Sequence, residues 1–253
     1  MAHDQSGVTD PYDSRLMTFR TRLLLPFFGL LAGLNLNSPP SLKAQESKVG
    51  SSYTKVLFLG NSITKHGPKA DIDWTGNWGM AATSEANDYV HQVMSGLTAR
   101  QRTAPAMLVK NIADFERAHV GYDLDGKLAE AFAFKADLII LAIGENVPAL
   151  KTDEAKAAFK AETMKLLQKL QGEHKPTILV RSCFWANTIK DQILQECCEA
   201  VGGIFVNIST LGKEEANYGR AERPYKHSGV ANHPGDKGMK AIAEAILAAL
   251  PKS

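Results

Sequence analysis

Residues 55–64 read Lys-Val-Leu-Phe-Leu-Gly-Asn-Ser-Ile-Thr, and this stretch decides the fold. The four apolar residues between Lys55 and Gly60 predict a short strand that is buried on both faces. Gly60 allows a sharp exit from that strand, because a residue without a Cβ atom takes φ > 0 at little cost. Ser62 follows at the carboxyl end of the strand, where ligands and reacting groups gather in open α/β sheets. The pattern predicts a reactive serine at a sheet edge, with an ordinary turn and helix cap as the alternative.

Short apolar segments alternate with helical segments along the rest of the chain. Further strands are predicted at 106–112, 137–143, 177–180 and 204–208, and helices at 79–99, 125–135, 152–172, 189–201 and 239–250. The strands are short and apolar throughout, as strands are when helices cover both faces of their sheet. The alternation predicts an α/β fold with three layers, in which a flavodoxin-like, five-stranded parallel sheet has helices on both faces.

The beginning of the chain has the composition of an export signal. Arg20 and Arg22 precede an apolar run at 23–34, and Ala44 stands directly before polar residues. The apolar run is too short to span a bilayer, which needs about 20 residues. We therefore expect three parts, namely a signal peptide with a polar lead over 1–44, a linker over 45–52 and one folded domain over 53–253.

Export would place the mature protein in the periplasm or outside the cell, without stable insertion in a membrane after cleavage of the signal. An uncleaved membrane anchor and an N-terminal core helix are the alternatives for the apolar run. Met17 is an alternative to Met1 as the start of the chain, because residues 1–16 add a polar lead without an evident role.

Charge and motif content exclude several function classes. The chain has 29 basic and 27 acidic residues, and it lacks the basic stripe that binding to nucleic acid requires. Glycine-rich dinucleotide and phosphate-loop motifs are absent. The three cysteines, Cys183, Cys197 and Cys198, form no Cys-x-x-Cys pair and are expected to be buried free thiols. The histidines have no metal-ligand spacing, so no metal and no cofactor is expected.

Two further polar motifs follow later in the chain. Gly-Glu-Asn at 144–146 ends the apolar run at 137–143, and Asn-His-Pro-Gly-Asp at 232–236 precedes the last predicted helix. A serine first, an asparagine in the middle and a histidine near the C-terminus resemble the SGNH (GDSL-type) hydrolase superfamily, whose Gly-Asp-Ser-Leu motif reads Gly-Asn-Ser-Ile at 60–63. The resemblance covers about residues 53 to 250, and it implies a flavodoxin-like serine ester hydrolase domain.

The resemblance implies a role for each of these residues. Ser62 is the expected nucleophile and His233 its general base, since an imidazole with a pKa of about 6.5 exchanges protons near neutral pH. The oxyanion would be bound by the Ser62 N–H, the Asn146 amide and one further backbone N–H. That third N–H falls at Glu116, where the family has glycine. The Glu116 carboxylate would repel an oxyanion unless it pairs, for example with Arg117.

A second departure concerns the orientation of the histidine. Val230 stands where the family has an aspartate three residues before its histidine. His233 then uses either a backbone carbonyl, which gives a Ser-His dyad, or a carboxylate from elsewhere. Asp236 is a possible orienting carboxylate, although its position before the last helix is also that of a cap. Further candidates for that carboxylate are Glu116 and Glu145.

Substrate cues come from aromatic residues on the predicted loops. Trp74, Trp78 and Tyr218 are candidates for substrate binding, because aromatic faces on loops suit stacking on sugars; the alternative is that they fill the core. Arg220, Arg223 and Lys226 suit an acidic polysaccharide or form a solvated face. We expect an exported serine esterase that hydrolyses O-acyl esters, foremost O-acetyl esters, of a carbohydrate or small molecule through an acyl-enzyme. The alternatives are a lipase, thioesterase or acyltransferase of the same fold, and a non-catalytic glycan-binding module with a decayed site.

Overall fold

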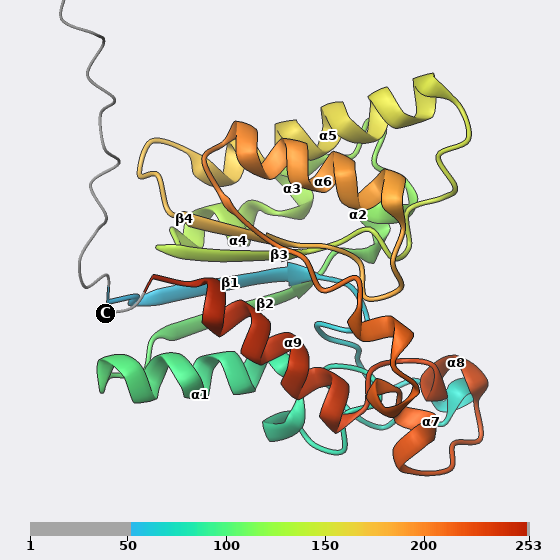
Figure 1. The fold of residues 1–253 in the computed structure, drawn as a ribbon. Helices are drawn as coiled ribbons and strands as arrows, with labels where there is room; N and C mark the ends of the chain where they lie inside the picture. The colour runs from blue at the N-terminus through green and yellow to red at the C-terminus, as the bar shows by residue number, and fades with distance from the viewer. Residues whose placement is uncertain (1–51, 252–253) are drawn as a thin grey trace, which may run out of the picture. The chain divides into compact units, whose positions relative to one another are not determined.

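The computed structural model describes residues 52–251 (Figure 1). The expected signal peptide over 1–44 and nearly all of the expected linker over 45–52 lie outside the described residues. Within 52–251, no helix combines the length and the hydropathy that crossing a membrane requires. The same part of the chain contains no group of three or more His, Cys, Asp or Glu side chains arranged to hold a metal ion.

Five parallel strands form one sheet in the order β2-β1-β3-β4-β5. The strands are β1 (Lys55–Gly60), β2 (Ala106–Asn111), β3 (Leu138–Ala142), β4 (Thr177–Arg181) and β5 (Ile204–Val206). In the register, Phe58 of β1 lies opposite Val109 of β2 and Ile140 of β3. The predicted five-stranded parallel sheet is therefore confirmed, with β1 paired on both sides.

Helices cover both faces of the sheet, which confirms the predicted three layers (Figure 1). One face carries α1 (Tyr89–Gln101) and α9 (Asp236–Ala249). The other carries α5 (Asp153–Gln171) and α6 (Thr188–Ala200), together with the short helices α3 (Leu124–Lys127) and α4 (Ala129–Phe134). Short helices in the loops are α2 (Ala113–Arg117), α7 (Gly219–Glu222) and α8 (Ser228–Ala231), and 3₁₀ turns are η1 (Ala70–Ile72), η2 (Glu85–Asn87), η3 (Leu211–Lys213) and η4 (Glu215–Asn217).

Strand β1 is apolar throughout because each of its faces belongs to a different core. Leu57 and Leu59 pack in the cluster under α5 and α6, whereas Val56 and Phe58 pack in the cluster under α1 and α9. All four side chains are fully buried. Burial of each contributes about 1.5–3 kcal/mol. The burial anchors the strand in the interior of the sheet and fixes where its carboxyl end, and hence Ser62, lies.

The predicted helix over 79–99 is wrong in its first half. Residues 79–88 form turns and η2, and α1 begins only at Tyr89. Ala81 has a left-handed φ of 75°, which a helix does not contain. The Asp88 carboxylate also binds the N–H groups of both Gly79 (3.1 Å) and His91 (2.7 Å), so it folds the loop back and caps α1. The apolar residues of 79–88 that have helical spacing in the sequence therefore belong to a loop.

The three cysteines are buried and free, as predicted. Burial raises the pKa of the Cys197 and Cys198 thiols to about 11. These thiols are therefore protonated near neutral pH and act as small apolar core residues.

Candidate active site

Ser62 and His233 lie within hydrogen-bond distance at the carboxyl edge of the sheet. Ser62 Oγ is 2.7 Å from His233 Nε2, although the two residues are 171 positions apart in the sequence. Ser62 lies in a turn after β1, in which the Asn61 carbonyl accepts from the N–H groups of Thr64 and Lys65, each at 2.9 Å. The structure thus brings together the predicted nucleophile and the predicted base.

Gly60 is required at the end of β1 for a reason other than the one we expected. Its φ is not positive. A Cβ at this position would lie 2.0 Å from Thr64 Oγ1 and 2.9 Å from the Ala142 carbonyl oxygen. The close approach of the Ser62 turn to β1 and β3 therefore excludes any side chain here.

The orientation of His233 is set by a backbone carbonyl. Its Nδ1 lies 2.7 Å from the Gly229 oxygen, which belongs to α8. A carbonyl oxygen only accepts, so Nδ1 carries the proton and Nε2 is free to accept from the Ser62 hydroxyl. The Trp185 ring packs edge-on against the imidazole, with centroids 5.3 Å apart. The geometry is the Ser-His dyad, one of the two arrangements expected from Val230.

Asp236 does not orient His233, so that prediction is wrong. Its carboxylate accepts from Thr83 N at 2.8 Å, from Thr83 Oγ1 at 2.6 Å and from Asn87 Nδ2 at 3.0 Å. It does not cap α9 either. The first N–H groups of that helix, at Asp236 and Lys237, donate to the Glu222 carboxylate at 2.8 Å each. Asp236 therefore ties α9 to the loop before α1.

Burial lowers the pKa of His233 to about 4, against a smaller opposing effect of the Gly229 hydrogen bond. No carboxylate in the described part of the chain pairs with the ring. The imidazole is therefore neutral near pH 7, which is the form that accepts a proton.

The candidate oxyanion donors are only partly available. Within residues 52–251 the Ser62 N–H has no hydrogen-bond partner. Asn146 Nδ2 donates one hydrogen to Glu116 Oε2 at 2.7 Å, and its second hydrogen remains for an oxyanion. The Glu116 N–H donates to the Ile112 carbonyl at 3.3 Å within α2, so its expected role as a donor is wrong.

The Glu116 side chain positions the loop that follows β3. It is fully buried and accepts from Gly144 N at 2.5 Å, from Asn146 Nδ2 at 2.7 Å and from Asn61 Nδ2 at 3.2 Å. Arg117, the expected partner of this carboxylate, instead donates to Asn146 Oδ1 at 3.1 Å. Both ends of the Asn146 amide are therefore fixed. Glu116 does not contact His233 and is not its orienting carboxylate.

Asn61 joins Glu116 to a buried ion pair. Its Nδ2 donates to Glu145 Oε2 at 2.7 Å, and Arg181 Nη1 donates to Glu145 Oε1 at 2.6 Å. Burial, followed by the charge of Glu145, raises the pKa of Glu116. Burial also raises the pKa of Glu145, but Arg181 and the hydrogen bonds outweigh it, so the net shift is downward. The network links Asn61, the residue before Ser62, to the loop that carries Asn146.

Sequence reasoning missed Arg181, Gly229 and Trp185. A signal for Arg181 exists, because an arginine at the end of an apolar strand needs a buried partner. Gly229 and Trp185 have no comparable signal, since neither a carbonyl nor an edge-on ring contact leaves a sequence pattern.

The three aromatic residues predicted to bind substrate lie in different environments. Tyr218 is 8% exposed, packs against Phe184 and lies under the Arg220 guanidinium at 3.8 Å, so it is not a platform for a sugar. Trp74 and Trp78 line a pocket of about 490 Å³ together with residues 223–227.

No family model matches the sequence, and no curated protein does. The chain is similar to solved structures of a lipase, of a putative lipolytic protein of the G-D-S-L family and of a carbohydrate esterase. A lipase from a goat rumen metagenome has 12% identity and a TM-score of 0.48, with 78% of this chain and 97% of the lipase covered.

Two other similar structures come from named bacteria. A putative lipolytic protein of the G-D-S-L family from Desulfitobacterium hafniense has 17% identity and a TM-score of 0.44, with 78% of this chain and 99% of that chain covered. A family two carbohydrate esterase from Cellvibrio japonicus has 16% identity and a TM-score of 0.45, with 77% and 59% covered. These structures are of the type that the motifs at 60–63, 144–146 and 232–236 resemble. With TM-scores below 0.5 they carry no argument about the reaction, which rests on the residues of this chain.

Proposed function

We propose that this protein is an exported serine esterase that hydrolyses O-acyl esters, with O-acetyl groups of a carbohydrate as its substrate. One observation carries the proposal: Ser62 Oγ lies 2.7 Å from His233 Nε2, while the Gly229 carbonyl holds the proton of the ring on Nδ1. A serine hydroxyl becomes an effective nucleophile when a base accepts its proton during attack. His233 is held in the tautomer that does so.

The reaction follows from this arrangement in two halves. Ser62 Oγ attacks the ester carbonyl carbon as its proton moves to His233 Nε2, and the carbonyl oxygen becomes an oxyanion. The Ser62 N–H and the second Asn146 Nδ2 hydrogen are the donors for that oxyanion. When the tetrahedral intermediate collapses, Nε2 returns the proton to the leaving alkoxide and an acyl-serine remains. Water, deprotonated by His233, then releases the carboxylic acid and regenerates Ser62.

Two features support the finer parts of the proposal. The pocket lined by Trp74, Trp78, Tyr225, Arg223 and Lys226 is aromatic and basic, which suits a sugar better than an acyl chain, because apolar lining alone would suffice for an acyl chain. The composition of residues 20–44 is typical of an export signal.

The first test is turnover of p-nitrophenyl acetate. The variant Ser62→Ala should lose at least about 10³-fold in kcat, as removal of a serine nucleophile does. Ser95→Ala, on the exposed side of α1, is the matched control and should keep wild-type activity. Full activity in Ser62→Ala would refute the nucleophile.

The second test separates a deacetylase from a lipase. If the acyl group is acetyl, kcat/KM should fall as the p-nitrophenyl ester is lengthened from acetate to octanoate. A rise with chain length would favour a lipase. Transfer of acetyl from the ester to an added sugar would indicate an acyltransferase, and glycan binding without any turnover a binding module.

A further inference from the structure

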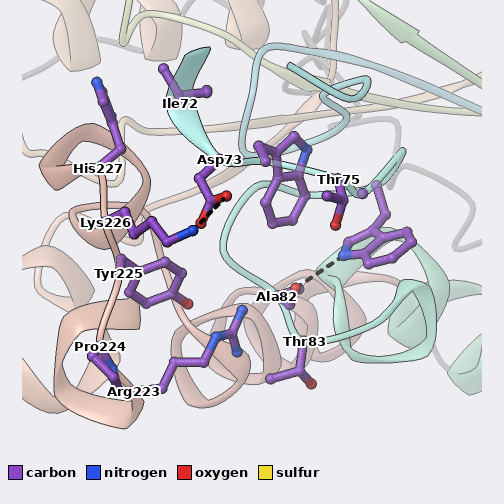
Figure 2. Close-up of a pocket in the computed structure, with 13 residues that line it drawn as sticks. Ile72, Asp73, Thr75, Ala82, Thr83, Arg223, Pro224, Tyr225, Lys226 and His227 are labelled. Atoms are coloured by element: carbon purple, nitrogen blue, oxygen red, sulfur yellow. Dashed lines mark hydrogen bonds and ion pairs between the residues drawn. The ribbon is translucent and has the colours of Figure 1, made fainter. Parts of the chain in front are cut away.

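A pocket of about 490 Å³ is lined by neither residue of the dyad. Its volume is within the range of about 300–1,000 Å³ typical of ligand sites. One wall is formed by residues 72–78 with 82–83, and the other by residues 223–227 (Figure 2).

Both walls are tied to the dyad by hydrogen bonds. The loop of the first wall is joined to the Ser62 turn, since Met80 N donates to the Ser62 carbonyl at 2.8 Å. The second wall ends at His227, whose Nδ1 accepts from Gly229 N at 3.1 Å and so caps α8. The Gly229 carbonyl in turn orients His233. The pocket is therefore held in a fixed position relative to the nucleophile and base.

Aromatic rings supply the apolar part of the lining. The polar atoms of these rings are already bonded, with Trp74 Nε1 donating to His66 O at 3.0 Å, Trp78 Nε1 to Ala82 O at 3.0 Å, and Tyr225 OH to Ala81 O at 2.9 Å. Trp74 is only 6% exposed, so the half-buried rings of Trp78 and Tyr225 are the ones that offer carbon surface to a ligand. Such surface suits the carbon-bound hydrogens on the face of a sugar ring.

Arg223 lines the same pocket with a charged guanidinium. Its Nη2 donates to the Ala81 carbonyl at 3.1 Å, and its guanidinium lies 4.7 Å from the centre of the Tyr225 ring. Its Nη1 is buried and has no hydrogen-bond partner among the described residues. A buried donor without an acceptor is costly, and a carboxylate is the acceptor that a guanidinium binds best.

Lys226 adds a second positive charge. Its Nζ lies 3.3 Å from Asp73 Oδ1 on the opposite wall, and Figure 2 shows this pair reaching across the pocket. The side chains of Lys226 and Asp73 are largely exposed, so the pair contributes only about 0–1 kcal/mol. An anionic ligand can therefore replace Asp73 as the partner of the lysine.

We propose that this pocket binds a carboxylate-bearing sugar residue of the substrate glycan, with the aromatic rings against the sugar and Arg223 on the carboxylate. The inference rests on the proposed function, because it identifies the pocket as the subsite next to the acylated sugar. The enzyme would then act on an acylated acidic polysaccharide.

Calorimetric titration of the purified protein with trigalacturonate and with its fully methyl-esterified form tests the inference. The two probes share rings and linkages and differ in charge. Wild-type protein should bind trigalacturonate at least about tenfold more tightly than the methyl-esterified form, because the ester cannot form the charged hydrogen bond that the carboxylate forms. Arg223→Met should abolish the difference. Arg220→Met, which removes a guanidinium outside the pocket lining, is the control and should keep it.

Equal binding of both probes by wild-type protein, or no binding of trigalacturonate, would overturn the inference even if Arg223→Met fails to fold. An equal loss in the Arg220→Met control would also overturn it. Turnover of p-nitrophenyl acetate reports on the proposed function separately, since that ester needs only the dyad. Turnover without binding of trigalacturonate would refute the acidic subsite alone, and binding without turnover would refute the esterase alone.

Discussion

At the residue scale, the chemistry depends on the two nitrogens of His233 having different partners. Nε2 faces the Ser62 hydroxyl, and Nδ1 donates to the Gly229 carbonyl. A carbonyl dipole fixes the tautomer as a carboxylate would, but it adds no full negative charge to hold a proton on the ring. The ring is thus oriented as a base while remaining hard to protonate.

The pH dependence of kcat/KM should reveal this environment. Because the pKa of His233 lies near 4, the ring stays neutral, and therefore active, down to about that pH. We expect kcat/KM for p-nitrophenyl acetate to be level near neutrality and to fall only as the pH drops toward 4, since this parameter reports the free enzyme. The unfolding transition should be followed over the same range. A half-maximal point near the ordinary histidine value of about 6.5 in folded protein would contradict the account.

Glu116 should affect catalysis through Asn146. In Glu116→Gln one oxygen acceptor becomes an NH₂ group that opposes an existing donor, so Asn146 or Asn61 loses its partner. We expect kcat to fall about 10- to 100-fold with KM nearly unchanged, because the oxyanion donor is needed mainly in the transition state. Urea unfolding should show a loss of about 1–3 kcal/mol. Glu130→Gln, at an exposed pair with Lys110, is the control. An unchanged kcat would contradict the positioning role.

Residue types at the site were largely predictable, whereas their partners were not. Ser62, His233 and Asn146 stand after buried strands or before the last helix, which places them at one edge of a parallel sheet. The sequence did not identify the Gly229 carbonyl as the partner of His233, because every residue has a backbone carbonyl. The sequence predicted that the backbone N–H of Glu116 would bind the oxyanion. In the structure its side-chain carboxylate has the positioning role instead, because it accepts from four N–H donors that only the fold brings together.

At the element scale, α9 and the loop before α1 are joined by a polar contact. The Asp236 carboxylate, at the start of α9, accepts from both the N–H and the hydroxyl of Thr83. The apolar periodicity predicted a helix at 239–250, and α9 begins three residues earlier and ends one residue earlier, because the buried face follows a helical repeat while the first turn is polar. The same reasoning failed over 79–88, where a left-handed residue and the Asp88 carboxylate override the spacing. Strand β2 was predicted as fully buried, yet it lies at the sheet edge and is partly exposed.

Replacing Asp236 should therefore weaken the fold without changing the base. In Asp236→Ala, Thr83 N and Thr83 Oγ1 lose their acceptor, and we expect the free energy of unfolding to fall by about 1–2 kcal/mol. The pH at which kcat/KM is half-maximal should stay where it is in the wild type, because Asp236 does not contact His233. Denaturant unfolding and the pH profile measure the two effects. A shifted profile with unchanged stability would restore Asp236 as an orienting carboxylate.

At the scale of the whole domain, the site exists because all five strands are parallel. Their carboxyl ends meet at one edge (Figure 1), and the loops after β1, β2, β3 and β4 carry Ser62, Glu116, Asn146 and Trp185. The loop before α9 adds His233 from 171 positions away. Strand alternation predicted this convergence, while the pocket between residues 72–83 and 223–227 depends on irregular loops that periodicity does not describe.

Processing of the N-terminus is a property of the whole chain. We expect the full-length protein, expressed in a host with a general export pathway, to be cleaved after Ala44 and to begin at Gln45. Intact mass and N-terminal sequencing of the exported fraction measure this. Recovery of the uncleaved chain in the membrane fraction would support the anchor instead.

Covalent labelling tests the central claim most directly. A fluorophosphonate reacts with a serine only when a neighbouring base activates it. Intact mass and peptide mapping of the labelled wild-type protein should show one adduct, located on Ser62, and His233→Ala should label at least about 10²-fold more slowly. Labelling of another residue, or equal labelling rates in wild type and His233→Ala, would contradict the Ser62–His233 dyad.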